Sequence, residues 1–399
     1  MSTATQLHAH RPDTVSAPPN TQVPAFDVLL ACCGVRRGSD RIRAMLSSPL
    51  DWERLLPLAE HHGLLPRMYH RISEWPEMVP GPWFSQLQWR YRNNARRCLT
   101  FTAELIRVVE HLNAQGIDVL PHKGPILAQG LYGDVAQRQF RDLDIFVRQG
   151  DAVRAKRALA DLGYRPTIQL SGERERAYIG SNSEYSFHGE GGRHLLEIQW
   201  RVVPRIYCAD FAVEQFFERA ETLRVGEREF QTLCAEDLLL VLCVHAAKHV
   251  WAQLSWLCEV LDLAGNERID WDRLLKEAGR LGLMRIVAVN FLLGERLLGA
   301  ALPEAIERWV NKDSAADDLT EEMGKIVSSS AYYHTESVAH FRLMMRMRER
   351  WRERARMVWR LAFTPGPGDW AAAQLPRSMS PLYGVVRGFR LAKRLASYD

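Results

Sequence analysis

The chain has no apolar run long enough to cross a membrane. Its longest run, Leu238–Val244, is followed directly by His245 and soon after by Lys248, whereas a transmembrane helix needs roughly 20 apolar residues. The run therefore predicts a buried helix. The N-terminus also lacks the basic and apolar segments of a secretory signal, and residues 1–24 predict a disordered tail.

Neither sign of charge dominates, and closely paired cysteines are missing. Lys and Arg number 52 against 48 Asp and Glu, a net charge of +4, which is too mild to indicate a dedicated nucleic-acid-binding protein. The 7 cysteines are scattered without a C-x-x-C pair, which argues against a disulfide framework and a zinc ribbon. We therefore expect a reduced, cytoplasmic protein with no nucleic-acid partner and no membrane span.

Hydrophobic periodicity divides the 399 residues into helical and strand-rich parts. Apolar residues recur every three to four positions near both ends, as in amphipathic helices. Between them, short β-rich runs alternate with helical ones, which predicts an α+β fold with a mixed sheet flanked by N- and C-terminal helical regions. The predicted regions are the tail (1–24), an N-terminal helical region (25–113), a mixed-sheet domain (114–205), a helical domain (206–363) and a C-terminal extension (364–399).

One helical pattern occurs twice. DWERLLPLAEHHGLLPRMY, which begins at Asp51, aligns without gaps with DWDRLLKEAGRLGLMRI, which begins at Asp270. In both copies the aspartate is a plausible N-cap and the tryptophan after it opens the helix. The repeat predicts the same helical hairpin on each side of the sheet domain.

Two acids stand two positions apart in DLDIFV, a segment with strand character. Because side chains alternate along a strand, Asp142 and Asp144 would share one face, with Leu143 and Ile145 on the other. Neighbouring carboxylates repel each other unless a cation lies between them, and Mg²⁺ binds such oxygens together with substrate phosphates. The alternative is a strand edge whose acids only face solvent.

A turn upstream favours the metal interpretation. Lys123-Gly124-Pro125 ends one predicted strand and starts a helix, so backbone N–H groups at the helix start could hold phosphate. Gly124 permits close approach of the backbone, and Pro125 suits the first helical turn because no donor is needed there. Lys123 could add a cation to the phosphates.

A third acid lies further along the chain. In HLLEIQWRV the side chain of Glu197 would share a strand face with Leu195 and Gln199. An unpaired acid is costly to bury in an apolar strand, so Glu197 lies either at a solvated strand end or at a metal. Three carboxylates around one or two Mg²⁺ ions suit in-line displacement at phosphorus. Asp142 and Asp144 would then hold the metals, and Glu197 would bind the metal nearer the acceptor or take the acceptor's proton.

Together these segments resemble a known family. HKGPILAQGLYGDVAQRQFRDLDIFV, LLEIQWRV, AEDLLLVLCVHAAKHVW and DWDRLL are similar to the uncharacterised bacterial nucleotidyltransferase family, within the DNA polymerase beta-like nucleotidyltransferase superfamily. Pro125 stands where the superfamily usually has Ser or Gly, and Gln199 where the family often has His. The resemblance implies Mg²⁺-dependent (or Mn²⁺-dependent) transfer of a nucleoside monophosphate from an NTP to an acceptor, with release of pyrophosphate.

The resemblance also indicates further nucleotide-binding residues. Arg138, and less strongly Arg141, lie in the family-like segment and could pair with a triphosphate. In H-A-A-K-H, Lys248 could contact phosphate, while His245 and His249 would line the nucleotide cleft, since the Glu of the zinc motif H-E-x-x-H is missing. The acceptor is left open as a small molecule, peptide or saccharide, because the family is often found beside genes for polysaccharides or peptide natural products.

Other interpretations remain open. The protein could be a catalytically inactive nucleotide-binding or partner-docking module of the same fold. It could also be an RNA-directed transferase that uses the arginine-rich segment Phe341–Phe363, although the acids within this segment favour a salt-bridged, exposed helix. On one continuous helix, an apolar stripe would form from Met344, Met347, Trp351, Ala355 and Val358. The oligomeric state is not indicated.

Overall fold

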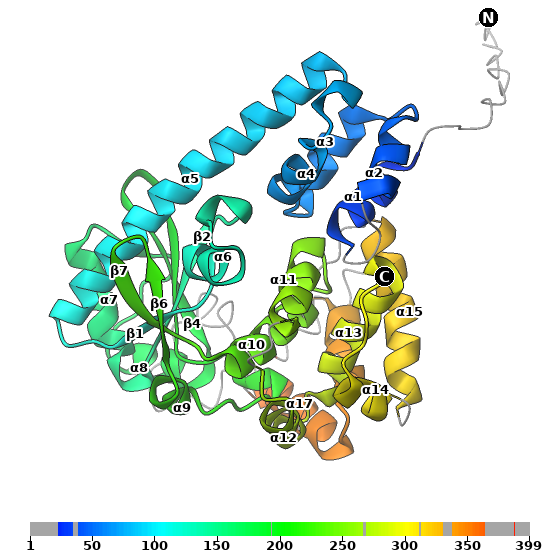
Figure 1. Ribbon diagram of the computed structural model, residues 1–399. Coiled ribbons are helices and arrows are strands. Elements are labelled where there is room, and N and C mark those ends of the chain that lie inside the picture. Colours follow the sequence, from blue (N-terminus) through cyan, green and yellow to red (C-terminus); the bar gives the residue numbers. More distant parts are fainter. Residues whose placement is uncertain are drawn as a thin grey trace, which may run out of the picture.

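The structure, a computed structural model, describes residues 23–34, 39–192, 194–265, 269–310, 313–329, 337–363 and 387. The predicted tail (1–24), except for its last two residues, and the predicted C-terminal extension (364–399), except for Arg387, lie outside these ranges. The fold is α+β, with helical parts before and after a mixed sheet along the chain, as the sequence predicts (Figure 1).

Helices alone make up the first part of the structure. They are α1 (Ala25–Cys33), α2 (Ser39–Leu46), α3 (Trp52–His61), α4 (Leu65–Ile72), the short 3-10 helix η1 (Pro76–Met78) and the 34-residue α5 (Gly81–Ala114).

The middle part carries the strands. Its elements are β1 (Val119–Pro121), α6 (Gly124–Tyr132), η2 (Val135–Gln137), β2 (Asp142–Val147), η3 (Gln149–Asp151), α7 (Ala152–Asp161), β3 (Arg165–Pro166), α8 (Gly172–Ser181), β4 (Glu184–His188), η4 (Glu190–Gly192), β5 (Leu195–Gln199), η5 (Arg205–Tyr207), α9 (Val213–Glu218), β6 (Glu221–Val225) and β7 (Arg228–Thr232).

The last part is again helical. Its elements are α10 (Ala235–Lys248), α11 (Leu254–Ala264), α12 (Trp271–Leu281), α13 (Met284–Leu298), α14 (Glu304–Val310), α15 (Ser314–Ser329), α16 (Val338–Arg346) and α17 (Trp351–Phe363).

The main sheet has five strands in the order β1-β2-β5-β4-β3. β2 and β5 run parallel, and the other neighbouring pairs are antiparallel. The predicted strand DLDIFV coincides with β2. The β6–β7 hairpin forms a separate two-stranded sheet inside the region 206–363, for which the sequence predicted helices.

The predicted repeat of a helical hairpin is confirmed. Asp51 caps α3 by accepting a hydrogen bond from the backbone N–H of Arg54, and Asp270 caps α12 through the N–H of Arg273, both at 3.0 Å. A second helix, α4 or α13, follows each capped helix. In both places the cap satisfies one of the N–H groups that a helix start leaves unpaired.

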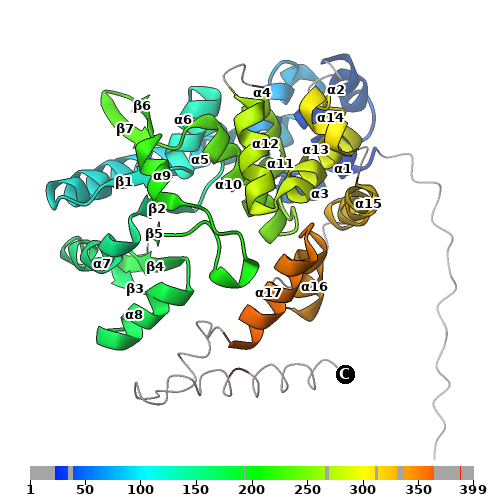
Figure 2. The ribbon, with the colours of Figure 1, turned by 90° about the horizontal axis from the view of Figure 1, so that it is seen from below.

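The helices from the two ends of the chain share one apolar core. Buried side chains of α1–α4 and of α10–α16 form a single cluster, whereas the sheet packs a second cluster against the C-terminal half of α5 and α7. α5 contributes to both, with Leu87 in the first and Phe101 in the second. Figure 2 shows the sheet with α7 and α8 on one side and α11–α15 on the other.

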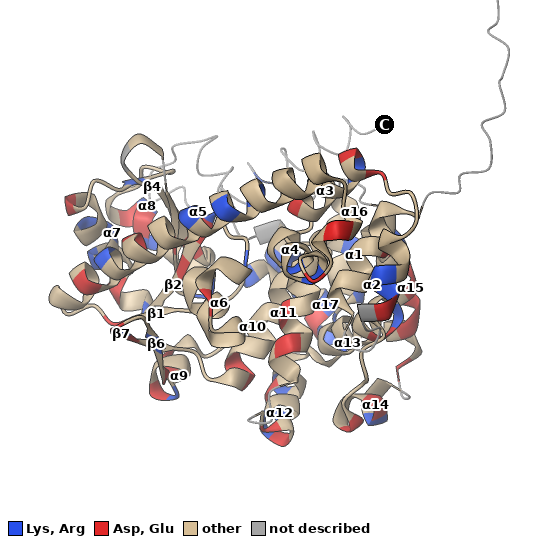
Figure 3. Ribbon diagram, turned by 45° about the horizontal axis from the view of Figure 1, so that its top comes forward, with Lys and Arg blue, Asp and Glu red and all other residues tan. Residues whose placement is uncertain are grey.

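The arginine-rich segment departs from its predicted geometry. It forms two helices, α16 and α17, with a break at Met347–Arg350. Met344 and Met347 are buried, but Trp351 is 71% exposed, so the predicted continuous stripe is wrong beyond Met347. Figure 3 shows basic and acidic residues intermixed along the helices. No helix in the described ranges has the length and apolar character needed to cross a membrane.

Candidate active site

Two neighbouring parallel strands bring the predicted acids together. In the β2–β5 register Asp144 is paired with Glu197, and Asp142 precedes Asp144 by two positions on the same face. Leu143 and Ile145 point the other way into the sheet core, as alternation along a strand requires. The prediction that the three acids converge is therefore confirmed, and all three line one cavity.

The glycine turn lies directly behind these acids. Gly124 opens α6 with φ +57°, and a β-carbon at this position would lie 3.4 Å from the carbonyl oxygen of Asp142. That distance is tight, and a positive φ is costly for residues with a side chain. Glycine thus lets the start of α6 press against β2, and Pro125 occupies the first turn as predicted.

Among these three acids, Asp144 is the one that is paired with a cation. Its Oδ1 accepts hydrogen bonds from Lys123 Nζ at 3.3 Å and from Gln199 Nε2 at 2.9 Å. Gln199 Nε2 also lies 3.4 Å from Glu197 Oε2. Burial alone would raise the pKa of Asp144, but the charge and hydrogen bond of Lys123, together with the charges of His122 and Arg138, outweigh burial, and the pKa lies below its ordinary value.

The other two acids lack such compensation. Burial and then the charge of Asp144 raise the pKa of Asp142 to about 6. Burial, followed by the charges of Glu184 and Asp144, raises the pKa of Glu197 to about 8. Among the described residues, Lys123–Asp144 is the only ion pair that any of these acids makes. The cluster therefore holds more negative charge than its cations balance.

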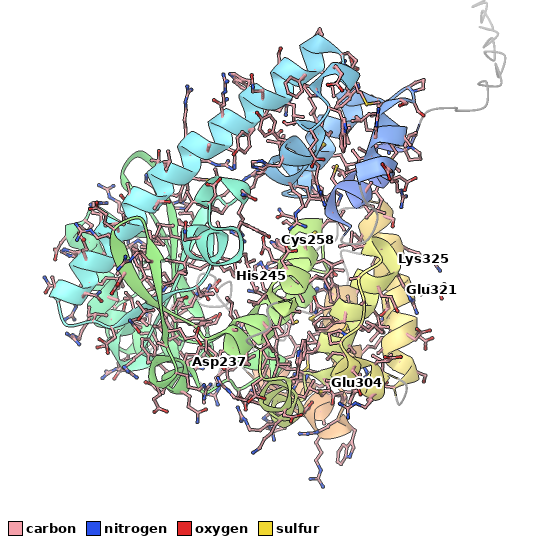
Figure 4. The ribbon with its side chains drawn as sticks, in the orientation of Figure 1. Asp237, His245, Cys258, Glu304, Glu321 and Lys325 are labelled. Carbon is pink, nitrogen blue, oxygen red and sulfur yellow. The ribbon has the colours of Figure 1, made fainter. Side chains whose placement is uncertain are left out.

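The cavity in front of the acids has a volume of about 300 Å³. Its opposite wall comes from α10 and α11, with His245, Lys248, His249 and Trp256 among the lining side chains. The ring centroid of Trp256 lies 4.9 Å from that of His245 and 5.4 Å from that of His249. Figure 4 places His245 on α10 in the centre of the molecule.

This wall depends on a break between two helices that the sequence did not predict. The apolar segment from Ala235 onward is split into α10 and α11, and Val250 and Trp251 between them have φ angles of 55° and 49°. Such values are unfavourable for bulky residues. A hydrogen bond of 2.8 Å from Trp251 Nε1 to Asn290 Oδ1 holds the turn, which places His249 and Trp256 on the same wall.

The predicted cations differ in their partners. Lys248 lines the cavity, and no carboxylate among the described residues is within ion-pair distance of its ammonium. Arg138 also lines the cavity but is buried in a two-point contact with Glu259 of α11, with N···O distances of 2.8 and 3.3 Å. Burial opposes this charge, yet Glu259 raises the pKa of Arg138 above its ordinary value. Its contact with phosphate stays a prediction.

The comparison with known families decides the family. Residues 48–299 match the family described as "Uncharacterised nucleotidyltransferase". The chain belongs to this family. The match runs from just before α3 to the end of α13 and includes every residue of the site described above. It supports nucleotidyl transfer as the general class of reaction.

Other similarities are slight. No curated protein matches the chain. Among solved structures, an antigenic nucleotidyltransferase-like protein from Paracoccidioides brasiliensis is similar over 49% of this chain and 89% of its own, with 13% identity and a TM-score of 0.28. At that TM-score the fold is judged from the strands and helices themselves.

The site of this nucleotidyltransferase family member offers the ligands that a hard divalent cation prefers. Carboxylate oxygens of Asp142, Asp144 and Glu197 share one face, and their uncompensated charge fits Mg²⁺ or Mn²⁺. As the side chains lie, no three His, Cys, Asp or Glu residues within the described ranges are grouped to hold a metal ion. Lys123 Nζ contacts Asp144.

Sequence reasoning missed two contributors to the site. Glu184 on β4 lies opposite Gln199 in the antiparallel β4–β5 register and lines the cavity as a further acid. The alternation argument applied to Glu197 would have identified it, since Glu184 opens a strand with Ser186 on the same face. Trp256 carried no signal, because its place depends on the break at Val250–Trp251.

Proposed function

We propose that this protein transfers a nucleoside monophosphate from an NTP to an acceptor hydroxyl or similar group, releasing pyrophosphate, with Mg²⁺ or Mn²⁺ as cofactor. The observation that carries the proposal is the register pairing of Asp144 with Glu197, with Asp142 on the same face, beside the Gly124 turn. An inactive module of the same fold would not need all three acids in one cavity.

The reaction class assigns a task to each group. The acceptor oxygen would form a bond to the α-phosphorus while the bond from that phosphorus to the bridging oxygen of pyrophosphate breaks. When bound, the divalent cation would supply charge neutralisation for the phosphates and the leaving pyrophosphate. Asp142 and Asp144 would hold it, and Glu197 would bind it on the acceptor side or take the acceptor's proton.

The cavity wall suggests how the nucleotide would lie. Lys123 and Lys248, which line the cavity, would receive the phosphates, and Lys123 directly precedes the start of α6 at Gly124, where backbone N–H groups favour anions. Trp256 and His249 would contact the base, because aromatic rings stack on bases of any sequence. Phosphates held between Lys123 and Lys248, with the base against Trp256, would place the α-phosphorus in front of the acids, which is how positioning lowers the barrier.

The decisive experiment is incubation with α-labelled NTPs, Mg²⁺ or Mn²⁺ and candidate acceptors or host extract. Label should appear in an acceptor and pyrophosphate should be released. Asp142→Asn and Asp144→Asn should abolish both while the circular dichroism spectrum stays unchanged. Equal pyrophosphate release from the wild type and both variants would refute the assignment.

A matched control separates metal ligands from acids that merely line the cavity. Glu60 also lines the cavity, but its carboxylate is paired with Arg90. Glu60→Gln should therefore leave pyrophosphate release within about twofold of the wild type, because its carboxylate already has a cationic partner of its own. If Glu60→Gln lost as much pyrophosphate release as Asp142→Asn does, the reaction would depend on other cavity-lining carboxylates as strongly as on those of β2.

A further inference from the structure

The ammonium of Lys123 is placed where the proposed chemistry needs a metal. Lys123 Nζ lies 3.3 Å from Asp144 Oδ1 and 3.2 Å from His245 Nδ1. The residue is only 8% exposed, and it is the residue that directly precedes α6. It therefore joins the acids of the sheet to the α10 wall across the cavity.

We propose that Lys123 is an internal counter-ion that takes a metal's place on Asp144 until a metal–nucleotide complex enters. The inference rests on the proposed function and adds an order of binding to it. Without nucleotide the ammonium neutralises part of the acid cluster and competes with a divalent ion. With nucleotide it moves to the phosphates, and Asp144 becomes free to bind the metal.

Burial explains why the ammonium stays on Asp144 in the free protein. A carboxylate and an ammonium are both costly to bury unpaired. Asp144 is 4% exposed, and Lys123 is its only ion-pair partner among the described residues. His245 contributes a neutral acceptor, because burial and then the charge of Lys123 lower the pKa of its imidazole well below the ordinary value. The ammonium thus has two acceptors in place.

The same contacts explain why the ammonium can leave. Lysine carries its charge on a flexible four-carbon stem and has three donors to redirect. Gln199 would remain on Asp144, since it donates to the same oxygen at 2.9 Å. His245 would keep its neutral ring against Trp256. An incoming triphosphate supplies the anionic partner that Lys123 would lose, so no buried charge is left unpaired.

The test is a titration of metal-free protein with Mn²⁺ alone, followed by electron paramagnetic resonance of the free ion. The wild type should bind Mn²⁺ weakly. Lys123→Met should bind it on the order of tenfold more tightly, because a competing cation is removed from a buried carboxylate. In the same variant, affinity for a non-hydrolysable NTP analogue should fall by a similar factor.

Lys248→Met is the matched control. Lys248 lines the same cavity, and no carboxylate in the described part of the chain lies within ion-pair distance of it, so its loss should leave Mn²⁺ affinity without nucleotide within about twofold of the wild type. If Lys123→Met bound Mn²⁺ no more tightly than the wild type, the counter-ion role would be wrong. Absence of Mn²⁺ binding in every protein, with or without nucleotide, would instead refute the proposed metal chemistry.

A measurement on the wild type covers the case in which Lys123→Met does not fold. Saturating Mn²⁺ should displace the ammonium, so acetylation of Lys123 by an amine-reactive ester, followed by mass spectrometry, should increase severalfold. Labelling of Lys248 should change less and serves as the internal reference. Unchanged labelling of Lys123 under conditions where Mn²⁺ is bound would overturn the proposal.

Discussion

Asp144 and Glu197 are register partners on the neighbouring parallel strands β2 and β5, yet their pKa values are shifted in opposite directions. Lys123 and Gln199 contact Asp144 and keep it ionised, whereas burial and the neighbouring acids raise the pKa of Glu197 to about 8. Acids with separated pKa values at one site are typical of catalytic centres. The predictions below follow from this asymmetry and from the contacts around it.

Glu197 should make stability depend on pH. Its pKa in the folded protein, about 8, lies above the ordinary value of 4.5, so the metal-free protein loses stability as pH rises through this window. Glu197→Gln removes that penalty. We expect equal melting temperatures near pH 4 and a higher one for the variant at pH 8, by about 1 °C per kcal/mol recovered. Calorimetry from pH 4 to 9, in buffer that contains a metal chelator, measures both melting temperatures. A lower melting temperature for Glu197→Gln than for the wild type at pH 8 would contradict the prediction.

Gly124 and Gly133 provide a matched pair for the turn. Both have positive φ, +57° and +68°, but a β-carbon at Gly133 would meet no atom within 4 Å. Each change to alanine should cost about 1–2 kcal/mol from the backbone alone. Gly124→Ala should cost more, because it also presses on Asp142. Urea unfolding measures both, and only Gly124→Ala should weaken binding of an NTP analogue. If both variants lost the same free energy of unfolding, the close approach of Gly124 to Asp142 would not contribute to stability.

The Arg138–Glu259 pair should be chiefly a structural link between the sheet and α11. Removing one partner leaves a buried charge, so Arg138→Met should destabilise the fold by about 3–5 kcal/mol. Arg138→Met with Glu259→Met should recover part of this loss, which urea unfolding of the single and double variants would measure. The folded double variant then tests the sequence prediction directly. If Arg138 contacts phosphate, the double variant should bind an NTP analogue more weakly than the wild type does. If Arg138 does not contact phosphate, the two affinities should be equal.

Trp256 should contribute to nucleotide affinity without contacting the acids. Replacing it by alanine removes the aromatic wall beside His249, and we expect affinity for an NTP analogue to fall on the order of tenfold. Trp89, which is 63% exposed on α5, is the control, and Trp89→Ala should bind as the wild type does. Fluorescence or calorimetric titration suffices. If Trp256→Ala bound the NTP analogue as tightly as the wild type does, the proposed contact between the base and this wall would be wrong.

Much of the site could be predicted because it depends on local periodicity. Alternation along β2 places Asp142 and Asp144 on one face whatever the rest of the fold does, and the same rule orients Glu197. The glycine turn was predictable because a positive φ and close backbone contact both require glycine. The Asp51 and Asp270 caps were predictable for a similar local reason.

The rest depends on contacts between distant residues. Arg138 meets Glu259, which lies 121 positions away, and no spacing rule links them. The break at Val250–Trp251 is held by tertiary packing and the bond to Asn290, against the helical preference of the segment. The arginine-rich stripe was wrong for a related reason, since a break after Met347 changes which side of the next helix is buried.

The common core of the first and last helices also affects how the protein is made. α1–α4 leave the ribosome long before α10–α16, with which they bury their apolar side chains. Such contacts between remote segments slow folding and leave hydrophobic surface uncovered in the meantime. Removing residues 25–80 would expose the apolar side chains that the later helices bury against them and favour aggregation, so shortened versions of the chain should retain these residues.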